Sequence, residues 1–282
     1  MIRKIRAHIE NIALHHTIFD LPFAYMGAFL AAGGMPPIMT IVWITLAITG
    51  ARSAALALDN LVDLKYDKKH PRFTHRPMVT GAVTRGEAVL LILASLLICF
   101  ASVMMLPPIC IKLLPIAAIP FLIYPFMKRV TFACHGVLGL AIAMAPAGGW
   151  VAVRAAIGAP MIVLCTAVGI WIGAFDVVYG AQDVRFDKAH GLHSTAVKFG
   201  VTNALMIARL CHVVCIAVFV LLGLMEHLAM PYYIGVAIAA MTLVYQHSII
   251  KPYDFSALTQ WYFMRNGIVS VAMLICTIIA LV

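Results

Sequence analysis

Long apolar runs separated by short polar connections dominate the chain. Crossing the hydrocarbon core of a bilayer takes about 20 apolar residues in a helix, whereas the strands of a membrane barrel alternate over shorter segments. The pattern therefore predicts an all-α integral membrane protein with nine transmembrane helices. The predicted spans cover residues 17–33, 37–58, 88–106, 109–126, 132–153, 160–181, 203–225, 230–248 and 264–282.

The composition of the chain supports this class of protein. Of the 282 residues, 63% are hydrophobic and 11% are charged, whereas soluble domains average roughly 45–50% and 25%. We expect a single transmembrane domain over residues 1–282, with small-residue runs at 27–34 and 145–149 that favour close helix packing. The seven cysteines lie in or beside apolar runs, which favours packing roles over disulfides or a metal site.

The basic residues indicate how the chain is oriented. Most of the 20 Lys and Arg residues lie in connections that fall on one side of the predicted helices, and Arg154 alone lies in the connections on the other side. The positive-inside rule then predicts a cytoplasmic amino terminus in the inner (cytoplasmic) membrane. The basic first residues lack the apolar core of a secretory signal, so we expect them to remain as a cytoplasmic amphipathic segment.

Two groups of aspartates interrupt this apolar background on the predicted cytoplasmic side. In the stretch "DNLVDLKYDKKHPRFTHRP", three carboxylates recur every four residues, and in "FDVVYGAQDVRFDKAHGLHS" three recur at spacings of seven and four. Both spacings place the carboxylates on one face of a helix. The two stripes are Asp59, Asp63 and Asp67 in the first and Asp176, Asp183 and Asp187 in the second.

Carboxylates at this depth need a water-filled cavity and strong cations. An ionised aspartate at mid-bilayer costs about 2.5–3.5 kcal/mol, and clustered carboxylates also repel one another. Magnesium prefers carboxylate oxygens and leaves ligand positions for substrate phosphates, which basic side chains can also bind. We therefore predict that the aspartates hold magnesium, which holds a diphosphate, rather than marking a solvated helix end. The interleaved basic residues are Lys68, Arg72, Arg76, Lys128, Arg129 and Lys188.

Four motifs occur along the chain in the order "DNLVDLKYD", "RPMVTGAVT", "YPFMKR" and "DVVYGAQDVRFDKAHGLHST". In these motifs the chain resembles the UbiA superfamily of intramembrane aromatic prenyltransferases. The resemblance implies nine helices around a central cavity, with magnesium-binding motifs at 59–67 and 176–187 facing the cytoplasm. It further implies transfer of a polyprenyl chain from its diphosphate to an aromatic acceptor, with the lipid bilayer as the surroundings and no nucleic acid or protein partner.

The resemblance also assigns roles to individual residues. Metal ligands are expected among Asp59, Asn60, Asp63, Asp67, Asp183 and Asp187. The diphosphate would be bound by Lys68, Arg72, Lys128, Arg129 and Lys188, while Asp176 and Tyr179, with Arg72 and Arg129, would serve the reacting centre. The first motif departs from the family pattern because Asp59 stands where Asn is usual and Asn60 where Asp is usual. The sequence leaves open which of the two is the ligand.

The acceptor is less clearly indicated than the donor. The segments "ALHHTIFDLPFA" and "CHGVLGLAIAMAPAGGW" are similar to the 4-hydroxybenzoate polyprenyltransferase-like branch, which serves ubiquinone or menaquinone biosynthesis. A futalosine-derived acceptor in menaquinone biosynthesis remains an alternative.

Metal-assisted ionisation would leave a cation-like allylic carbon, which Tyr124, Tyr179 and Phe175 could shelter through cation–π contact. Two other classes compete with this reading. A membrane diphosphatase would use the same metals with water as the acceptor. An ion- or proton-coupled transporter is suggested by Asp20, a lone acid in the first predicted span.

Overall fold

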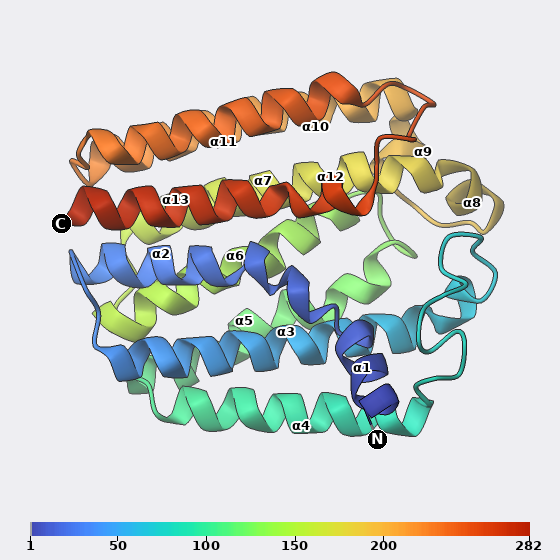
Figure 1. The fold of residues 1–282 in the computed structure, drawn as a ribbon, viewed down its shortest axis with the longest axis horizontal. Helices are drawn as coiled ribbons and strands as arrows, with labels where there is room; N and C mark the ends of the chain where they lie inside the picture. The colour runs from blue at the N-terminus through green and yellow to red at the C-terminus, as the bar shows by residue number, and fades with distance from the viewer. Residues whose placement is uncertain (1) are drawn as a thin grey trace.

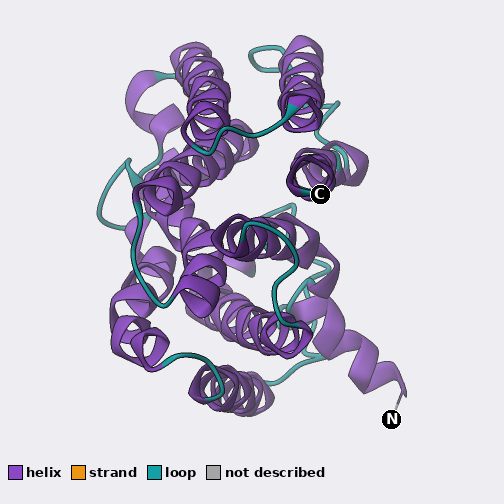
Figure 2. Ribbon diagram, turned by 90° about the vertical axis from the view of Figure 1, so that its left-hand side faces the viewer, coloured by secondary structure: helices purple, strands orange, loops and turns teal. Residues whose placement is uncertain are grey.

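The computed structural model describes residues 2–282, and within them the regular elements are helices, with one isolated bridge between Lys251 and Asp254. The prediction of an all-α protein is confirmed. The long helices run side by side along the molecule (Figure 1) and are seen nearly end-on in the perpendicular view (Figure 2). They are α2 (Leu21–Ala32), α3 (Ile38–Asp67), α4 (Arg85–Met104), α5 (Pro108–Met127), α6 (Cys134–Arg154), α7 (Ala159–Gly180), α10 (Val201–Met225), α11 (Met230–Ile249) and α13 (Asn266–Leu281).

Shorter helices occupy the ends of the bundle. They are α1 (Ile2–Asn11), η1 (Leu14–Phe19), η2 (Ala181–Asp183), α8 (Val184–Ala189), α9 (Thr195–Phe199) and α12 (Gln260–Met264). The loop of residues 68–84 lies at the same end as α8 and α9 (Figure 1). The first aspartate stripe lies in the last turns of α3, and the second runs from α7 through η2 into α8. Both stripes therefore lie toward this end of the bundle.

The expected count of nine spanning helices is not confirmed. Seven helical segments of the described chain are long and apolar enough to cross a membrane: 38–67, 85–104, 108–127, 134–154, 159–189, 201–225 and 260–281. The first predicted span is broken, since η1 is a 3-10 helix and α2 begins only at Leu21, with Pro22 in its first turn. Helix α11 is long enough, but Gln246 and His247 dilute its apolar character.

The helices pack closely where small residues meet. A side chain added at Gly27 would collide with the backbone of Pro146, and one added at Gly149 would collide with the backbone of Ala24. These two contacts join α2 to α6 and confirm the packing role expected of the two small-residue runs. The largest core cluster surrounds α7, whose Trp171 is completely buried.

Local backbone geometry explains why the "RPMVTGAVT" segment carries glycine at position 81 and threonine at position 84. Gly81 has a φ of 77°, a left-handed conformation that favours glycine. Thr84 then caps α4 by accepting a hydrogen bond from the Glu87 backbone N–H, and Glu87 bonds back to Thr84. Met78 and Val83 are buried in a small cluster with the end of α3. The segment thus folds the loop of residues 68–84, which we call the basic loop, back toward the aspartates.

Candidate active site

The two aspartate stripes meet through a residue of the basic loop. Arg72 forms an ion pair with Asp183 of η2, and its guanidinium carbon lies 5.1 Å from the centre of the Tyr179 ring. His70 lies 3.3 Å from the same carboxylate, and its ring stacks on Phe73 and meets the Phe186 ring at a tilt. The loop that follows α3 is therefore held against the segment that follows α7.

Other cations link the remaining carboxylates. The Arg129 guanidinium lies 2.6 Å from Asp63, and that of Arg76 lies 2.6 Å from Asp67. Lys128 Nζ lies 3.9 Å from Asp187. Arginine and lysine side chains from the end of α5 and from the basic loop thus face both stripes at once.

These groups line a small polar cavity of about 40 Å³. The structure thereby brings together four of the six predicted metal ligands and two of the predicted diphosphate ligands. The lining residues are Asp63, Tyr66, Asp67, His70, Phe73, Lys128, Arg129, Asp183, Phe186, Asp187 and Leu192.

Three predicted diphosphate ligands do not line this cavity. Arg72 pairs with Asp183, which does line it. Lys68 and Lys188 are exposed and do not line the cavity. Each follows an aspartate of its stripe by one residue, which turns it about 100° around the helix axis. Their role in binding the diphosphate stays a prediction.

The exchanged pair of the first motif has two different environments. The Asn60 side chain donates to the Asn11 carbonyl oxygen (2.6 Å) and accepts from Arg76 (3.2 Å). Both of its polar ends are therefore engaged with the amino-terminal segment and the basic loop. Asp59 shares the helical face of Asp63.

Asp176 is the member of the second stripe that pairs with a histidine. His135 of α6 lies 2.7 Å from its carboxylate through Nδ1, and His135 itself is buried. Asp176 keeps part of its surface exposed, and the ring of Phe175 stacks on Tyr179 at 6.1 Å. The contact with the buried histidine fixes the position of the Asp176 carboxylate.

The charges of the site act on the protonation of residues outside the spanning helices. Burial works against the charged form of Lys128, but the carboxylates of Asp187, Asp176 and Asp183 together raise its pKa. Burial lowers the pKa of His70, with Asp183 opposing the change. Lys128 is therefore a cation at neutral pH, while His70 is neutral.

The donor atoms suit magnesium, although they do not form a ready ligand set. Within residues 2–282, no group of three or more His, Cys, Asp or Glu side chains is placed to hold a metal ion, and arginines engage three of the carboxylates. The buried Asp187 Oδ2 has no hydrogen-bond partner in the described chain. A hard cation with oxygen ligands fits these groups once they turn from the arginines toward it.

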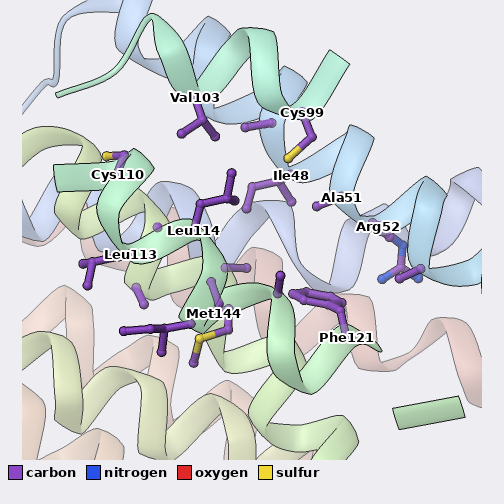
Figure 3. A pocket seen from close by; sticks show the side chains of 18 of the residues that line it. Ile48, Ala51, Arg52, Cys99, Val103, Cys110, Leu113, Leu114, Phe121 and Met144 are labelled. Atoms are coloured by element: carbon purple, nitrogen blue, oxygen red, sulfur yellow. The ribbon is translucent and has the colours of Figure 1, made fainter. Parts of the chain in front are cut away.

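A second, larger cavity of about 370 Å³ lies beside residues 44–58 of α3, the part of the helix that precedes the aspartates. Apolar side chains of α3 to α6 form most of its wall, with Arg52 at one end near Phe121 (Figure 3). Arg52 is ion-paired with Asp20, the acid that sequence reasoning took as a lone residue. The volume lies at the lower end of the roughly 300–1,000 Å³ typical of small-molecule sites.

Sequence reasoning missed two residues of this region, Arg52 and His70, and did not predict the contacts of a third, Arg76. Arg52 stands seven residues before Asp59, so its place on the aspartate face was a readable signal. Arg76 was noted only as one of several basic residues, and its contact with Asn60 and Asp67 requires the loop to fold back. No signal in the sequence marks His70 among the neighbouring basic residues.

Comparisons with known proteins agree with this architecture. The sequence profile of the UbiA prenyltransferase family matches residues 21–268. A 4-hydroxybenzoate octaprenyltransferase of Vibrio campbellii is 33% identical over 257 residues, which cover 89% of this chain and 88% of that protein.

Solved structures lead to the same group. The apo structure of a UbiA homolog from Aeropyrum pernix matches with a TM-score of 0.86 and 28% identity, covering 95% of this chain and 99% of that one. A UbiA homolog from Archaeoglobus fulgidus, bound to GPP and Mg²⁺, shares the fold with a TM-score of 0.74 at 20% identity, over 98% of this chain and 99% of that one.

The long apolar helices and the shared fold define a multi-pass membrane protein. The chain belongs to the UbiA prenyltransferase family, and it is a prenyltransferase. The resemblance carried by its four motifs is thereby confirmed.

Proposed function

We propose that the protein transfers a polyprenyl group from a prenyl diphosphate to an aromatic acceptor, with magnesium as cofactor, in quinone biosynthesis. The observation that carries this proposal is the cluster of carboxylates and arginines around the end of α3, the helix that also lines the apolar cavity. The proposal also covers the topology of the protein. The chain forms one domain that spans the inner membrane nine times, its amino terminus lies in the cytoplasm, and its active site faces the cytoplasm.

The carboxylates that line or flank the polar cavity are the proposed magnesium ligands: Asp59, Asp63, Asp67, Asp183 and Asp187. Asn60 acts as a positioning residue, since both ends of its amide are engaged by Asn11 and Arg76. Bound magnesium supplies Lewis-acid stabilisation for the charge of the departing diphosphate.

The basic residues bind the leaving group. Arg72, Arg129 and Lys128 turn from their aspartates toward the phosphate oxygens, and the arginines offer two parallel N–H donors to a phosphate edge. As the allylic C–O bond breaks, its electron pair leaves with the diphosphate, and these donors meet the charge where it develops.

The acceptor then completes the reaction. A carbon of the electron-rich ring forms the new C–C bond, and the ring loses a proton. We assign the role of receiving that proton to Asp176, which is held by His135, and the role of sheltering the allylic cation to the Tyr179 and Phe175 rings.

The acceptor is proposed from the relatives. Several curated relatives are 4-hydroxybenzoate octaprenyltransferases, so 4-hydroxybenzoate is the first acceptor to assay, with a futalosine-derived aromatic as the alternative. A transporter is not supported by Asp20, because Arg52 neutralises that acid.

The experiment supplies purified protein with magnesium, a radiolabelled prenyl diphosphate and a panel of aromatic acceptors. A labelled prenylated acceptor formed only with magnesium supports the proposal. Release of free prenyl alcohol at the same rate with and without acceptor would instead identify a diphosphatase. Failure to consume the diphosphate would contradict both.

A further inference from the structure

The amino-terminal helix α1 lies across the direction of the other helices. The long helices run along the molecule in Figure 1 and are seen nearly end-on in Figure 2. Helix α1 crosses them in the first view and is seen lengthwise in the second, where it projects from the bundle toward the amino terminus. Because the long helices cross the bilayer, α1 lies roughly parallel to the membrane surface.

An ion pair fixes the depth of α1. Lys4 Nζ lies 2.6 Å from the Glu87 carboxylate. Glu87 belongs to the first turn of α4, where its side chain completes the capping box with Thr84. Since α4 is long and apolar enough to cross a membrane, its first turn marks the level at which the chain enters the bilayer. Helix α1 therefore lies at the membrane surface, at the end of the bundle that carries the aspartate stripes.

The two faces of α1 have different surroundings. Ala7 is buried in a cluster with Leu64 of α3 and Val83 of the basic loop. Ile5 and Ile9 share a face that lies about 200° around the helix from Ala7. Their side chains are 51% and 44% exposed. One face of α1 thus packs on the protein, and the opposite face presents isoleucines to the surroundings.

Basic side chains flank the exposed isoleucines. Arg3 and Arg6 are both exposed, and within residues 2–282 Arg3 forms no ion pair. Arg6 pairs with Glu10 of the same helix, but both side chains are largely exposed, where such pairs contribute little. A helix in the plane of the membrane, with an apolar face and exposed bases, is typical of segments that bind anionic bilayer surfaces. The charges of α1 therefore favour anionic headgroups over neutral ones.

The carboxyl end of α1 is connected to the first aspartate motif. The Asn60 side chain donates to the carbonyl oxygen of Asn11, the last residue of α1, and accepts from Arg76. Arg76 in turn lies 2.6 Å from the Asp67 carboxylate. A change in the position of α1 therefore reaches a proposed magnesium ligand through two hydrogen-bonded side chains.

We propose that α1 binds the anionic surface of the bilayer and that this binding holds the first aspartate motif in its active arrangement. Ile5 and Ile9 enter the boundary between headgroups and acyl chains, and Arg3 and Arg6 contact the phosphates of anionic lipids. Binding of α1 to the lipid surface is independent of the reaction. Its effect on turnover rests on the proposed prenyl transfer.

The first test measures the binding of α1 in full-length protein held in lipid nanodiscs. An environment-sensitive fluorophore is attached at Ile5→Cys in a background without the seven native cysteines. With phosphatidylglycerol added to phosphatidylcholine, its emission should shift to the blue, and a nitroxide-labelled lipid should quench it. The same label at His75→Cys, an exposed residue of the basic loop, is the control and should report water in both lipids. Emission typical of water from both labels would overturn the proposal.

The contribution of the bases is measured with the same label. A base close to an anionic surface contributes about fivefold to binding. Arg3→Gln/Arg6→Gln should therefore lower the ratio of bound to free α1 about 25-fold with phosphatidylglycerol present. An unchanged ratio would overturn the preference of α1 for anionic lipid.

The second test measures turnover in the same nanodiscs at saturating magnesium, prenyl diphosphate and acceptor. Wild type should be several-fold faster with phosphatidylglycerol than without it, whereas Arg3→Gln/Arg6→Gln should be equally slow in both. The matched control is Lys251→Gln, which removes an exposed base outside α1 and should respond to the lipid as wild type does. Binding of α1 without any change in turnover would overturn its connection to the first motif. Absence of product in every lipid, with the binding of α1 intact, would overturn the proposed function and leave the lipid-binding role of α1 standing.

Discussion

Arg72 offers the sharpest test of how the site binds the leaving group. Its guanidinium pairs with Asp183 and lies over the Tyr179 ring, so it could serve only to neutralise a buried acid. Lysine at this position keeps the charge but loses the planar pair of donors that fits a phosphate edge. If neutralisation is the whole role, Arg72→Lys should be active. If Arg72 binds the departing diphosphate, turnover should fall.

The size of the fall follows from the surroundings of the side chain. Removing one donor from a site where negative charge develops costs about 2.7–4 kcal/mol. Because 30% of the Arg72 side chain is exposed, solvent screens part of the interaction, and we take the lower limit. About 2.7 kcal/mol corresponds to a roughly 100-fold loss in kcat.

The assay is steady-state kinetics with labelled prenyl diphosphate at saturating magnesium and acceptor. The matched control is Arg185→Lys, the same substitution at an exposed residue of α8 within the second motif, which should keep wild-type turnover. Size-exclusion chromatography in detergent should show both variants folded. Wild-type kcat in Arg72→Lys would refute diphosphate binding by this residue and leave it as a partner of Asp183 alone.

Three further predictions follow from the same arrangement. Asp63→Ala and Asp183→Ala should each lower transfer by about 100-fold or more, because each removes a proposed metal ligand from a different stripe; either variant retaining substantial activity at high magnesium would contradict the two-stripe site. A single cysteine at His75 should react with a membrane-impermeant thiol reagent only from the cytoplasmic side, and one at Gly158 only from outside; the reverse pattern would contradict the proposed orientation. Gly81→Ala should destabilise the basic loop by about 1–2 kcal/mol because of its left-handed backbone, seen as a lower melting temperature.

Each of these measurements has a control in the chain. Asp254→Ala removes a carboxylate from an exposed loop, and labelling needs a background in which the seven native cysteines are replaced. Gly86→Ala, at a helical glycine with open space around its Cα, should keep or slightly raise the melting temperature. An equal loss of stability at both glycines would contradict the role given to the Gly81 backbone.

The sequence predicted the helices and the two stripes because both depend on local spacing. Asp63 and Asp67 fall on one face through the helical period alone, and the structure places both at the polar cavity. The same period turns Lys68 and Lys188 away from the face of the aspartate before each of them, and both are exposed and do not line the polar cavity. The sequence analysis grouped basic residues with the aspartates because they are close in the sequence. The direction of each side chain decides which groups it contacts in the fold.

Pairings between distant segments could not be predicted in this way. Arg52 and Asp20 are 32 residues apart, and their contact depends on how α2 packs against α3. His135 and Asp176 meet because α6 and α7 run side by side, with Gly180 leaving room for the imidazole ring. Such contacts are properties of the assembled bundle and have no local signature.

The cross-linking of the two stripes also has a consequence for biosynthesis. Arg129 is synthesised 66 residues after its partner Asp63, and Asp183 is synthesised 111 residues after its partner Arg72. At a synthesis rate of roughly 5–20 residues per second, the second interval lasts roughly 6–22 s. During that time the partners of these charged groups have not yet been synthesised, so the charged side chains at the end of α3 and in the loop after it must stay hydrated until the second half arrives. A protein cut between the halves would carry unmatched charges in both fragments, and its activity should return only when the fragments are made together.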